Sequence, residues 1–167
     1  NYTSDEIISY FGDKVTFNFT VVPSEDDSTG KVIFENLDPI SFGSGGTAEN
    51  GYNKPYGLLD EENSMITIPV QGFGYESWDF LGFDAPTLDE SEYYYTPIYI
   101  RFDGNDTLTF TNAWGIITDP EAWEYWSFYN GGFSCKKNTG TIQQSVYSNA
   151  APKPLSLHKL GKTYIDA

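Results

Sequence analysis

The chain has 167 residues, with 24 acidic and 9 basic side chains, a formal net charge of −15 and 17% aromatic residues. This length suits one domain with a sizeable core, and the aromatic content argues against disorder. The acidity argues against nucleic-acid binding, because phosphate neutralisation needs clusters of Lys and Arg, and against docking on anionic membranes. No apolar run approaches the roughly 20 residues of a membrane-spanning helix. We therefore expect a folded domain with no nucleic-acid partner and no membrane span in this chain.

The charge is unevenly distributed along the chain. Residues 1–135 carry 23 acidic and 4 basic side chains, whereas residues 136–167 carry 1 acidic and 5 basic ones. This shift in composition predicts a single domain over residues 1–138. Residues 139–167 are predicted to be an extended basic C-terminal segment, which either packs on the domain or forms a tail.

Alternation of apolar and polar residues, typical of strands with one buried face, recurs along the chain. In chain order, the predicted strands are Lys14–Val22, Lys31–Leu37, Tyr56–Asp60, Met65–Val70, Trp78–Asp84, Tyr93–Phe102, Thr107–Ile117 and Phe133–Lys137. Asp103-Gly104 supplies the positive φ of a tight hairpin turn. Residues 41–55 contain four glycines and predict a long loop, of the kind that often carries function.

Two short helices are also predicted. Ser4 can cap a helix over Asp5–Phe11, which would end before Gly12. Residues 118–121, T-D-P-E, have the form of a capping box with proline in the first turn. They predict a helix to about residue 126, and an aromatic strand over residues 123–129 is the alternative.

Successive hairpins predict an all-β fold, an antiparallel meander of about eight strands with one or two short helices. Closing the meander into a barrel removes exposed strand edges, and packing two sheets face to face is the other solution. We favour a closed barrel and keep a β-sandwich as the alternative. The single cysteine, Cys135, excludes an intrachain disulfide and is expected to be a small buried apolar group.

Four segments carry a resemblance to known proteins. They are G-K-V-I-F-E-N-L (30–37), P-Y-G-L-L-D-E-E-N-S-M-I-T-I-P-V-Q-G (55–72), W-D-F-L-G-F-D (78–84) and R-F-D-G-N-D-T-L-T-F-T-N-A-W-G-I-I (101–117). In this order, over residues 13–118, they resemble secreted or lipid-anchored β-rich modules from gut Bacteroidetes. The resemblance implies a calycin-like barrel or a sandwich, and export to the periplasm or the outer-membrane surface. It also implies a role in polysaccharide handling and is compatible with a lipid anchor upstream of the chain. It indicates no catalytic residues.

Aromatic residues are the candidate binding residues. Sugars present C–H faces that stack on aromatic rings, so exposed rings beside acidic and amide groups suit glycan binding; core packing is the competing role. The candidate ligand-binding residues are Trp123, Trp126, Tyr75, Tyr52 and Tyr94. Trp78 and Trp114 lie within strand patterns and are predicted to be core residues.

These features favour a non-catalytic exported envelope module that binds a glycan or another surface ligand. A protein-binding, adhesin-like or structural accessory subunit is one alternative. A glycan hydrolase is another, and it would need two carboxylates facing each other across a cleft. We expect no cofactor, metal or catalytic residue: residues 103–106 offer oxygen atoms but lack the ligand spacing of an EF-hand.

Overall fold

The computed structural model describes residues 1–25, 30–41, 51–87, 92–104, 106–119, 121–122 and 124–137, together with short strands at 147–148, 155–156 and 163–165. Strands are its regular elements, and no helix occurs within these ranges. The predicted all-β class is therefore confirmed.

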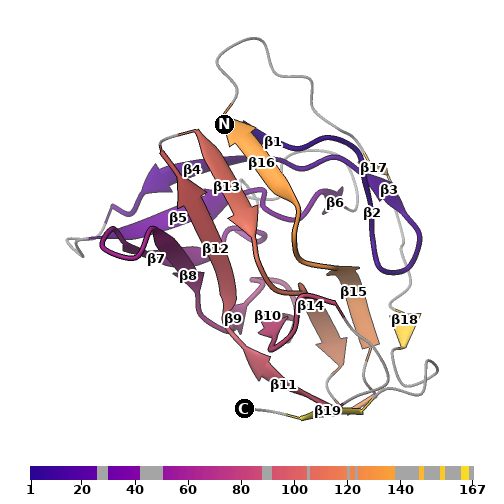
Figure 1. The fold of residues 1–167 in the computed structure, drawn as a ribbon. Helices are drawn as coiled ribbons and strands as arrows, with labels where there is room; N and C mark the ends of the chain where they lie inside the picture. Colours follow the sequence, from indigo (N-terminus) through magenta and orange to yellow (C-terminus); the bar gives the residue numbers. More distant parts are fainter. Residues whose placement is uncertain are drawn as a thin grey trace.

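Eight strands form a closed antiparallel barrel (Figure 1). They are β1 (Tyr2–Thr3), β4 (Asn18–Pro23), β5 (Lys31–Glu35), β7 (Tyr56–Asp60), β8 (Met65–Ile68), β12 (Ile98–Asp103), β13 (Thr107–Phe110) and β16 (Ser134–Lys137). Around the barrel they follow chain order, each pairing antiparallel with the next. The barrel is thus confirmed over the sandwich.

The barrel closes through its first strand. Tyr2 of β1 lies opposite Phe19 of β4 on one side and opposite Lys137 of β16 on the other. The backbone N–H of Lys137 also donates to the carbonyl oxygen of Asp106, 2.6 Å away. The two residues of β1 therefore join the next barrel strand, β4, to the last one, β16, and leave no open barrel edge.

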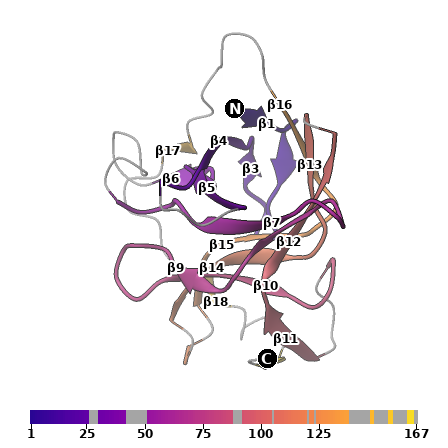
Figure 2. The ribbon, with the colours of Figure 1, turned by 90° about the vertical axis from the view of Figure 1, so that its left-hand side faces the viewer.

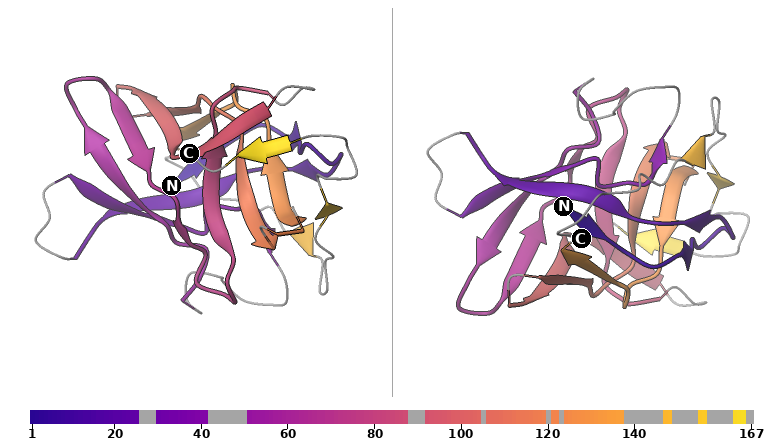
Figure 3. Two further views of the ribbon diagram at one scale, coloured as in Figure 1. Left: turned by 90° about the horizontal axis from the view of Figure 1, so that it is seen from below. Right: turned by 90° about the horizontal axis from the view of Figure 1, so that it is seen from above.

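A second, seven-stranded sheet lies beside the barrel (Figures 2 and 3). Its strands are β9 (Gln71–Gly72), β10 (Asp79–Phe83), β11 (Glu92–Thr96), β14 (Trp114–Asp119), β15 (Glu124–Tyr129), β18 (Leu155–Ser156) and β19 (Thr163–Ile165). Strands β9–β11 are inserted between barrel strands β8 and β12, and β14 and β15 between β13 and β16. The meander is thus interrupted twice by excursions into a second sheet.

The two predicted helices are not confirmed. Ile7–Ile8 forms strand β2, which pairs with β3 (Lys14–Val15), and Gly12 takes a φ of 96° in the turn between them. Glu124–Tyr129 is strand β15, which agrees with the aromatic-strand alternative. Cross-strand pairing outweighs the weak helical signal of these short segments.

The C-terminal segment contributes short strands. β18 pairs with β15, β19 with β11, and β17 (Tyr147–Ser148) pairs parallel with β6 (Ile40–Ser41). The remaining residues from 138 to the C-terminus lie outside the described part. The division into a domain over residues 1–138 and a segment over residues 139–167 stays a prediction.

Aromatic rings fill the region where the barrel meets the second sheet. Phe17 contacts the rings of Phe110 at 5.9 Å, Trp114 at 5.8 Å and Tyr129 at 5.0 Å, and all four side chains are buried. Trp114 is therefore a core residue, as predicted. Cys135 is also buried, as expected, and burial raises the pKa of its thiol well above the ordinary value.

Asn112 holds the barrel and the second sheet together where β13 leads into β14. Its Nδ2 atom donates to the carbonyl oxygens of Phe83 and Pro97, both at 3.0 Å, and its Oδ1 atom accepts from the backbone N–H of Tyr99 at 2.9 Å. The side chain is buried, so its backbone partners have little access to water. This amide therefore joins β10, the β11–β12 connection and β12.

We predict that Asn112→Ala lowers the free energy of unfolding by about 2–3 kcal/mol, because buried backbone groups would lose their partners. Thr111→Val is the matched control: the Thr111 hydroxyl donates to the carbonyl oxygen of Tyr99 (3.0 Å) at an exposed position, so its loss should cost under about 1 kcal/mol. Urea denaturation measures both changes. Equal losses in the two variants would contradict the role given to Asn112.

Candidate functional site

Three of the predicted binding residues meet in one aromatic cluster, defined here as Tyr52, Tyr75, Trp78 and Trp126. The ring centroids of Tyr52 and Tyr75 are 5.9 Å apart, those of Tyr75 and Trp78 are 5.1 Å apart, and those of Trp78 and Trp126 are 5.1 Å apart. These residues come from the loop before β7, the turn between β9 and β10, and strand β15. The fold thus assembles a continuous row of rings from separate segments.

The row runs from the core to the surface. Trp126 is only 7% exposed, Tyr52 and Trp78 are half-buried, and Tyr75 is 38% exposed. Phe73 lies beneath them, fully buried, with its ring centroid 5.7 Å from that of Tyr52 and 5.8 Å from that of Trp78. A ligand would therefore meet Tyr75 first, with Tyr52 and Trp78 beside it.

A tight turn positions Tyr75 and Trp78. The backbone N–H of Phe73 donates to the carbonyl oxygen of Trp78 at 2.7 Å, and that of Trp78 donates to the carbonyl oxygen of Tyr75 at 3.3 Å. Gly74 and Glu76 take positive φ values of 95° and 52° within the turn. The backbone here is held by its own hydrogen bonds, which favours a preformed surface.

Asn53 fastens the loop that carries Tyr52. Its backbone N–H donates to the carbonyl oxygen of Phe73 at 3.0 Å. Its side chain pairs with the backbone of Asp38: Oδ1 accepts from the Asp38 N–H at 2.8 Å, and Nδ2 donates to the Asp38 carbonyl oxygen at 2.9 Å. Asp38 in turn accepts a hydrogen bond from the buried Tyr129 hydroxyl, whose pKa burial and this carboxylate raise. The cluster is thereby tied to the core.

The other two predicted binding residues do not join the cluster. Tyr94 is exposed on β11, where its backbone N–H donates to the Asp84 carboxylate at 3.0 Å, and no described ring contact links it to the cluster. Trp123 lies outside the described residues. Trp78 belongs to the cluster, although its place at the start of a strand-like pattern predicts a core residue. The sequence has no signal that distinguishes a core tryptophan from one in a half-buried surface cluster.

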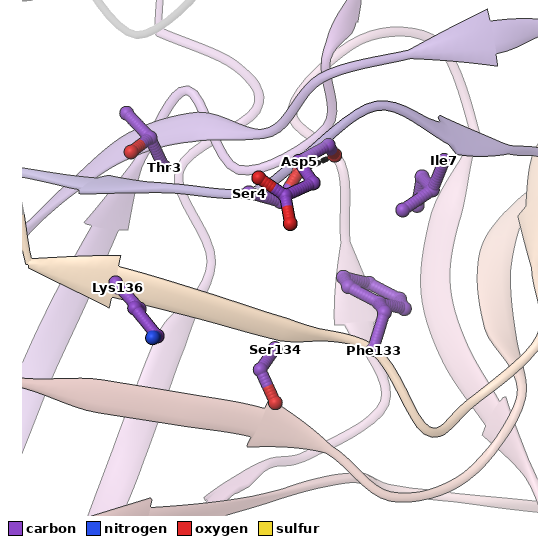
Figure 4. Close-up of a pocket in the computed structure, with 7 residues that line it drawn as sticks. All are labelled: Thr3, Ser4, Asp5, Ile7, Phe133, Ser134 and Lys136. Carbon is purple, nitrogen blue, oxygen red and sulfur yellow. Dashed lines mark hydrogen bonds between the residues drawn. The ribbon is translucent and has the colours of Figure 1, made fainter.

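The cavities in the described part include the following three. One, of about 410 Å³, lies between β1 and β16 and is lined by Ser4, Asp5, Phe133 and Lys136, among others (Figure 4). A second, of about 560 Å³, lies in the barrel, and a third, of about 300 Å³, lies beside Asn112. Their linings show what chemistry each can support.

None of these cavities provides the acidic pair that a hydrolase needs. Each is lined by a single carboxylate: Asp5, Glu61 and Asp84 respectively. Burial raises the pKa of Asp79, but Asp79 lines none of the three. Across the described residues, no group of three or more His, Cys, Asp or Glu side chains is placed to hold a metal ion. These three cavities therefore give the hydrolase alternative no support.

Comparisons with known proteins do not extend these observations. A scan of family models, a search of curated proteins and a search of solved structures each found no match to this chain. Within the described ranges, no helix has the length and apolarity needed to cross a membrane. Function therefore has to be inferred from the residues of the chain itself.

We predict that Gly74→Ala destabilises the protein more than Gly132→Ala. Both glycines have φ near 95°, so alanine costs each about 1–2 kcal/mol of backbone strain. A Cβ atom at Gly74 would also lie 2.6 Å from the carbonyl oxygen of Gly51 and 2.9 Å from the Cα atom of Tyr52, whereas one at Gly132 would meet nothing within 4 Å. The clash should add about 1–3 kcal/mol.

Urea denaturation gives the stability difference between the two variants, and near-UV circular dichroism reports the packing of aromatic rings. Only Gly74→Ala should change the near-UV spectrum, because the Gly51–Tyr52 backbone must move away from the turn. Equal stability and unchanged spectra in both variants would show that the loop and the turn are not packed this closely.

Proposed function

We propose that this protein is a non-catalytic, exported module of the bacterial cell envelope that binds a glycan through the aromatic cluster. The observation that carries the proposal is the convergence of Tyr52, Tyr75 and Trp126 with Trp78, although these residues lie in separate parts of the sequence. Three of the five residues that were candidates for binding on chemical grounds alone thus lie together on the molecule.

The chemistry around Tyr75 suits a sugar. An aromatic ring offers an apolar face for the C–H groups of a pyranose, and nearby polar groups can hydrogen-bond its hydroxyls. Glu76 and Ser77 are exposed in the same turn as Tyr75, and Lys54 is exposed beside the loop that carries Tyr52. One partly exposed ring flanked by polar side chains fits the end or edge of a glycan better than a long chain.

Export, and a place in the periplasm or on the outer-membrane surface, is proposed on different grounds. Its support is the resemblance of residues 13–118 to secreted or lipid-anchored modules of gut Bacteroidetes. A polysaccharide is the proposed partner, and a cell-surface protein is the alternative. Binding measurements with purified components separate these two partners.

We predict that Tyr75→Ala weakens glycan binding by about tenfold, which corresponds to about 1.4 kcal/mol for the loss of one stacked ring. Tyr99→Ala is the matched control, because Tyr99 is 37% exposed, close to the 38% of Tyr75, but lies on barrel strand β12 outside the cluster. A glycan array of plant and host polysaccharides would select the ligand, and isothermal titration would compare the variants.

Two outcomes would overturn the proposal. One is no binding to any glycan on the array by the folded wild-type protein. The other is equal weakening by Tyr75→Ala and Tyr99→Ala, which would place binding outside the cluster. If the protein binds an envelope protein, and Tyr75→Ala binds it as tightly as the wild type does, the protein-binding alternative would be favoured.

A further inference from the structure

The largest of the three described cavities lies inside one end of the barrel and has a volume of about 560 Å³. Every barrel strand contributes to its wall. The lining residues are Tyr2, Val21, Val32, Leu59, Glu61, Ile66, Phe102, Gly104, Thr107, Leu108 and Lys137. Its volume falls within the range of pockets that hold small molecules, and eight-stranded barrels are wide enough to hold one small ligand.

The cavity exists because the barrel interior is filled unevenly. Near the second sheet, the inward positions hold large buried rings, including Phe19, Phe34 and Phe110. Two residues further along the same strands, toward the hairpin turns, the inward positions hold the smaller Val21, Val32 and Leu108. Alternate residues of a strand face the same side, so each pair lies on the inner wall. One end of the barrel is therefore filled by large rings, and the other is lined mainly by smaller aliphatic side chains, together with Tyr2 and Phe102.

The cavity opens to solvent at the hairpin turns. Glu61, Gly104 and Lys137 are exposed, whereas Ile66 and Leu108 are buried. Polar groups thus line the mouth and apolar groups line the interior. This gradient suits an amphipathic molecule whose apolar part enters the barrel and whose polar head stays at the mouth.

The mouth carries more negative than positive charge in the described part. Acidic side chains lie in or beside two of its hairpin turns: Asp60, Glu61, Glu62, Asp103 and Asp106. The basic side chains near them are Lys137, Lys136, which lies on β16 opposite Thr107, and Arg101, whose guanidinium lies 3.6 Å from the Asp103 carboxylate. The mouth therefore favours a head group that is positive over one that is negative.

Two carboxylates show how this charge acts locally. Hydrogen bonds from Asn63 lower the pKa of Asp60, so this carboxylate stays ionised and orders the turn that carries Glu61. Burial and the charge of Asp106 both raise the pKa of Tyr2, which lines the cavity. The Asp106 carboxylate therefore acts on a residue of the cavity wall.

We propose that the barrel mouth binds a small amphipathic molecule with an apolar chain and a cationic head. The chain lies against Val21, Val32 and Leu59, and the head lies beside Glu61 at the mouth. This site is separate from the aromatic cluster, which contains none of the lining residues of the cavity. It therefore takes a different class of ligand from the proposed glycan.

Fluorescence titration with N-phenyl-1-naphthylamine, an uncharged probe that brightens in apolar surroundings, tests the site directly. Decylamine, decanol and decanoate, which share one chain length and differ in head charge, then compete for the bound probe. We expect decylamine to displace the probe at the lowest concentration and decanoate at the highest, with at least a tenfold difference between these two. Failure of the probe to bind, or stronger competition by decanoate than by decylamine, would overturn the proposal.

Two pairs of variants locate the binding. Leu59→Trp fills the cavity and should lower probe affinity at least tenfold, whereas Leu58→Trp, at a 46% exposed position on the outer face of the same strand, should leave it unchanged. Glu61→Gln should reduce the preference for decylamine over decanoate at least threefold. Glu62→Gln, in the same turn but outside the lining, should reduce it less.

Circular dichroism checks that each variant is folded. If Leu59→Trp does not fold, the Glu61→Gln and Glu62→Gln pair still tests the site, because both changes are at exposed positions. Equal affinity in Leu59→Trp and Leu58→Trp, or an equal change of preference in Glu61→Gln and Glu62→Gln, would contradict binding at the mouth. Loss of glycan binding in Tyr75→Ala bears on the other site alone.

Discussion

The buried carboxamide of Asn53 is the interaction on which the aromatic surface depends. It pairs with both the N–H and the carbonyl group of Asp38, while the backbone of Asn53 bonds to the carbonyl oxygen of Phe73 and the N–H of Asn36. One residue therefore joins the segments that follow β5, precede β7 and follow β9. Each of these backbone groups would cost about 1–3 kcal/mol if it were buried without a partner, so the three segments are held as one unit.

A side-chain amide also pairs with a backbone where the chain passes from the barrel to the second sheet. The Gln71 side chain accepts from the N–H of Tyr56 and donates to its carbonyl oxygen, both at 2.9 Å, beyond the last pairing of β8. Asn112 plays a similar part after β13. An amide side chain offers both a donor and an acceptor, so it can replace a neighbouring strand where the ladders of two sheets diverge. These side-chain amides hold the barrel and the second sheet together beside the aromatic cluster. The hairpin turns at the far end of the barrel leave its mouth open.

The sequence predicted the local parts of this structure better than their assembly. Alternation located most barrel strands, and Asp103-Gly104 located a hairpin, because both signals are local. Barrel closure rests on pairing Tyr2 with Lys137, which no local pattern reveals. The helix expected over residues 5–11 is instead a hairpin, because pairing with β3 outweighs propensity. The chemistry of aromatic rings predicted Tyr75 as a binding residue, but only long-range packing brings Tyr52 and Trp78 beside it. The barrel cavity could not be predicted, because its lining residues come from strands that meet only in the closed fold.

Hydrogen exchange of backbone amides, measured by NMR in Asn53→Gly, tests this account most directly. Glycine tolerates the φ of 60° at this position, so the variant removes the carboxamide without adding backbone strain. We expect the amides of Asn36 and Asp38 to lose at least tenfold in protection, while those of β12 and β13 stay protected. Unchanged protection at Asn36 and Asp38 would show that the Asn53 side chain does not hold these segments together, and would contradict the account.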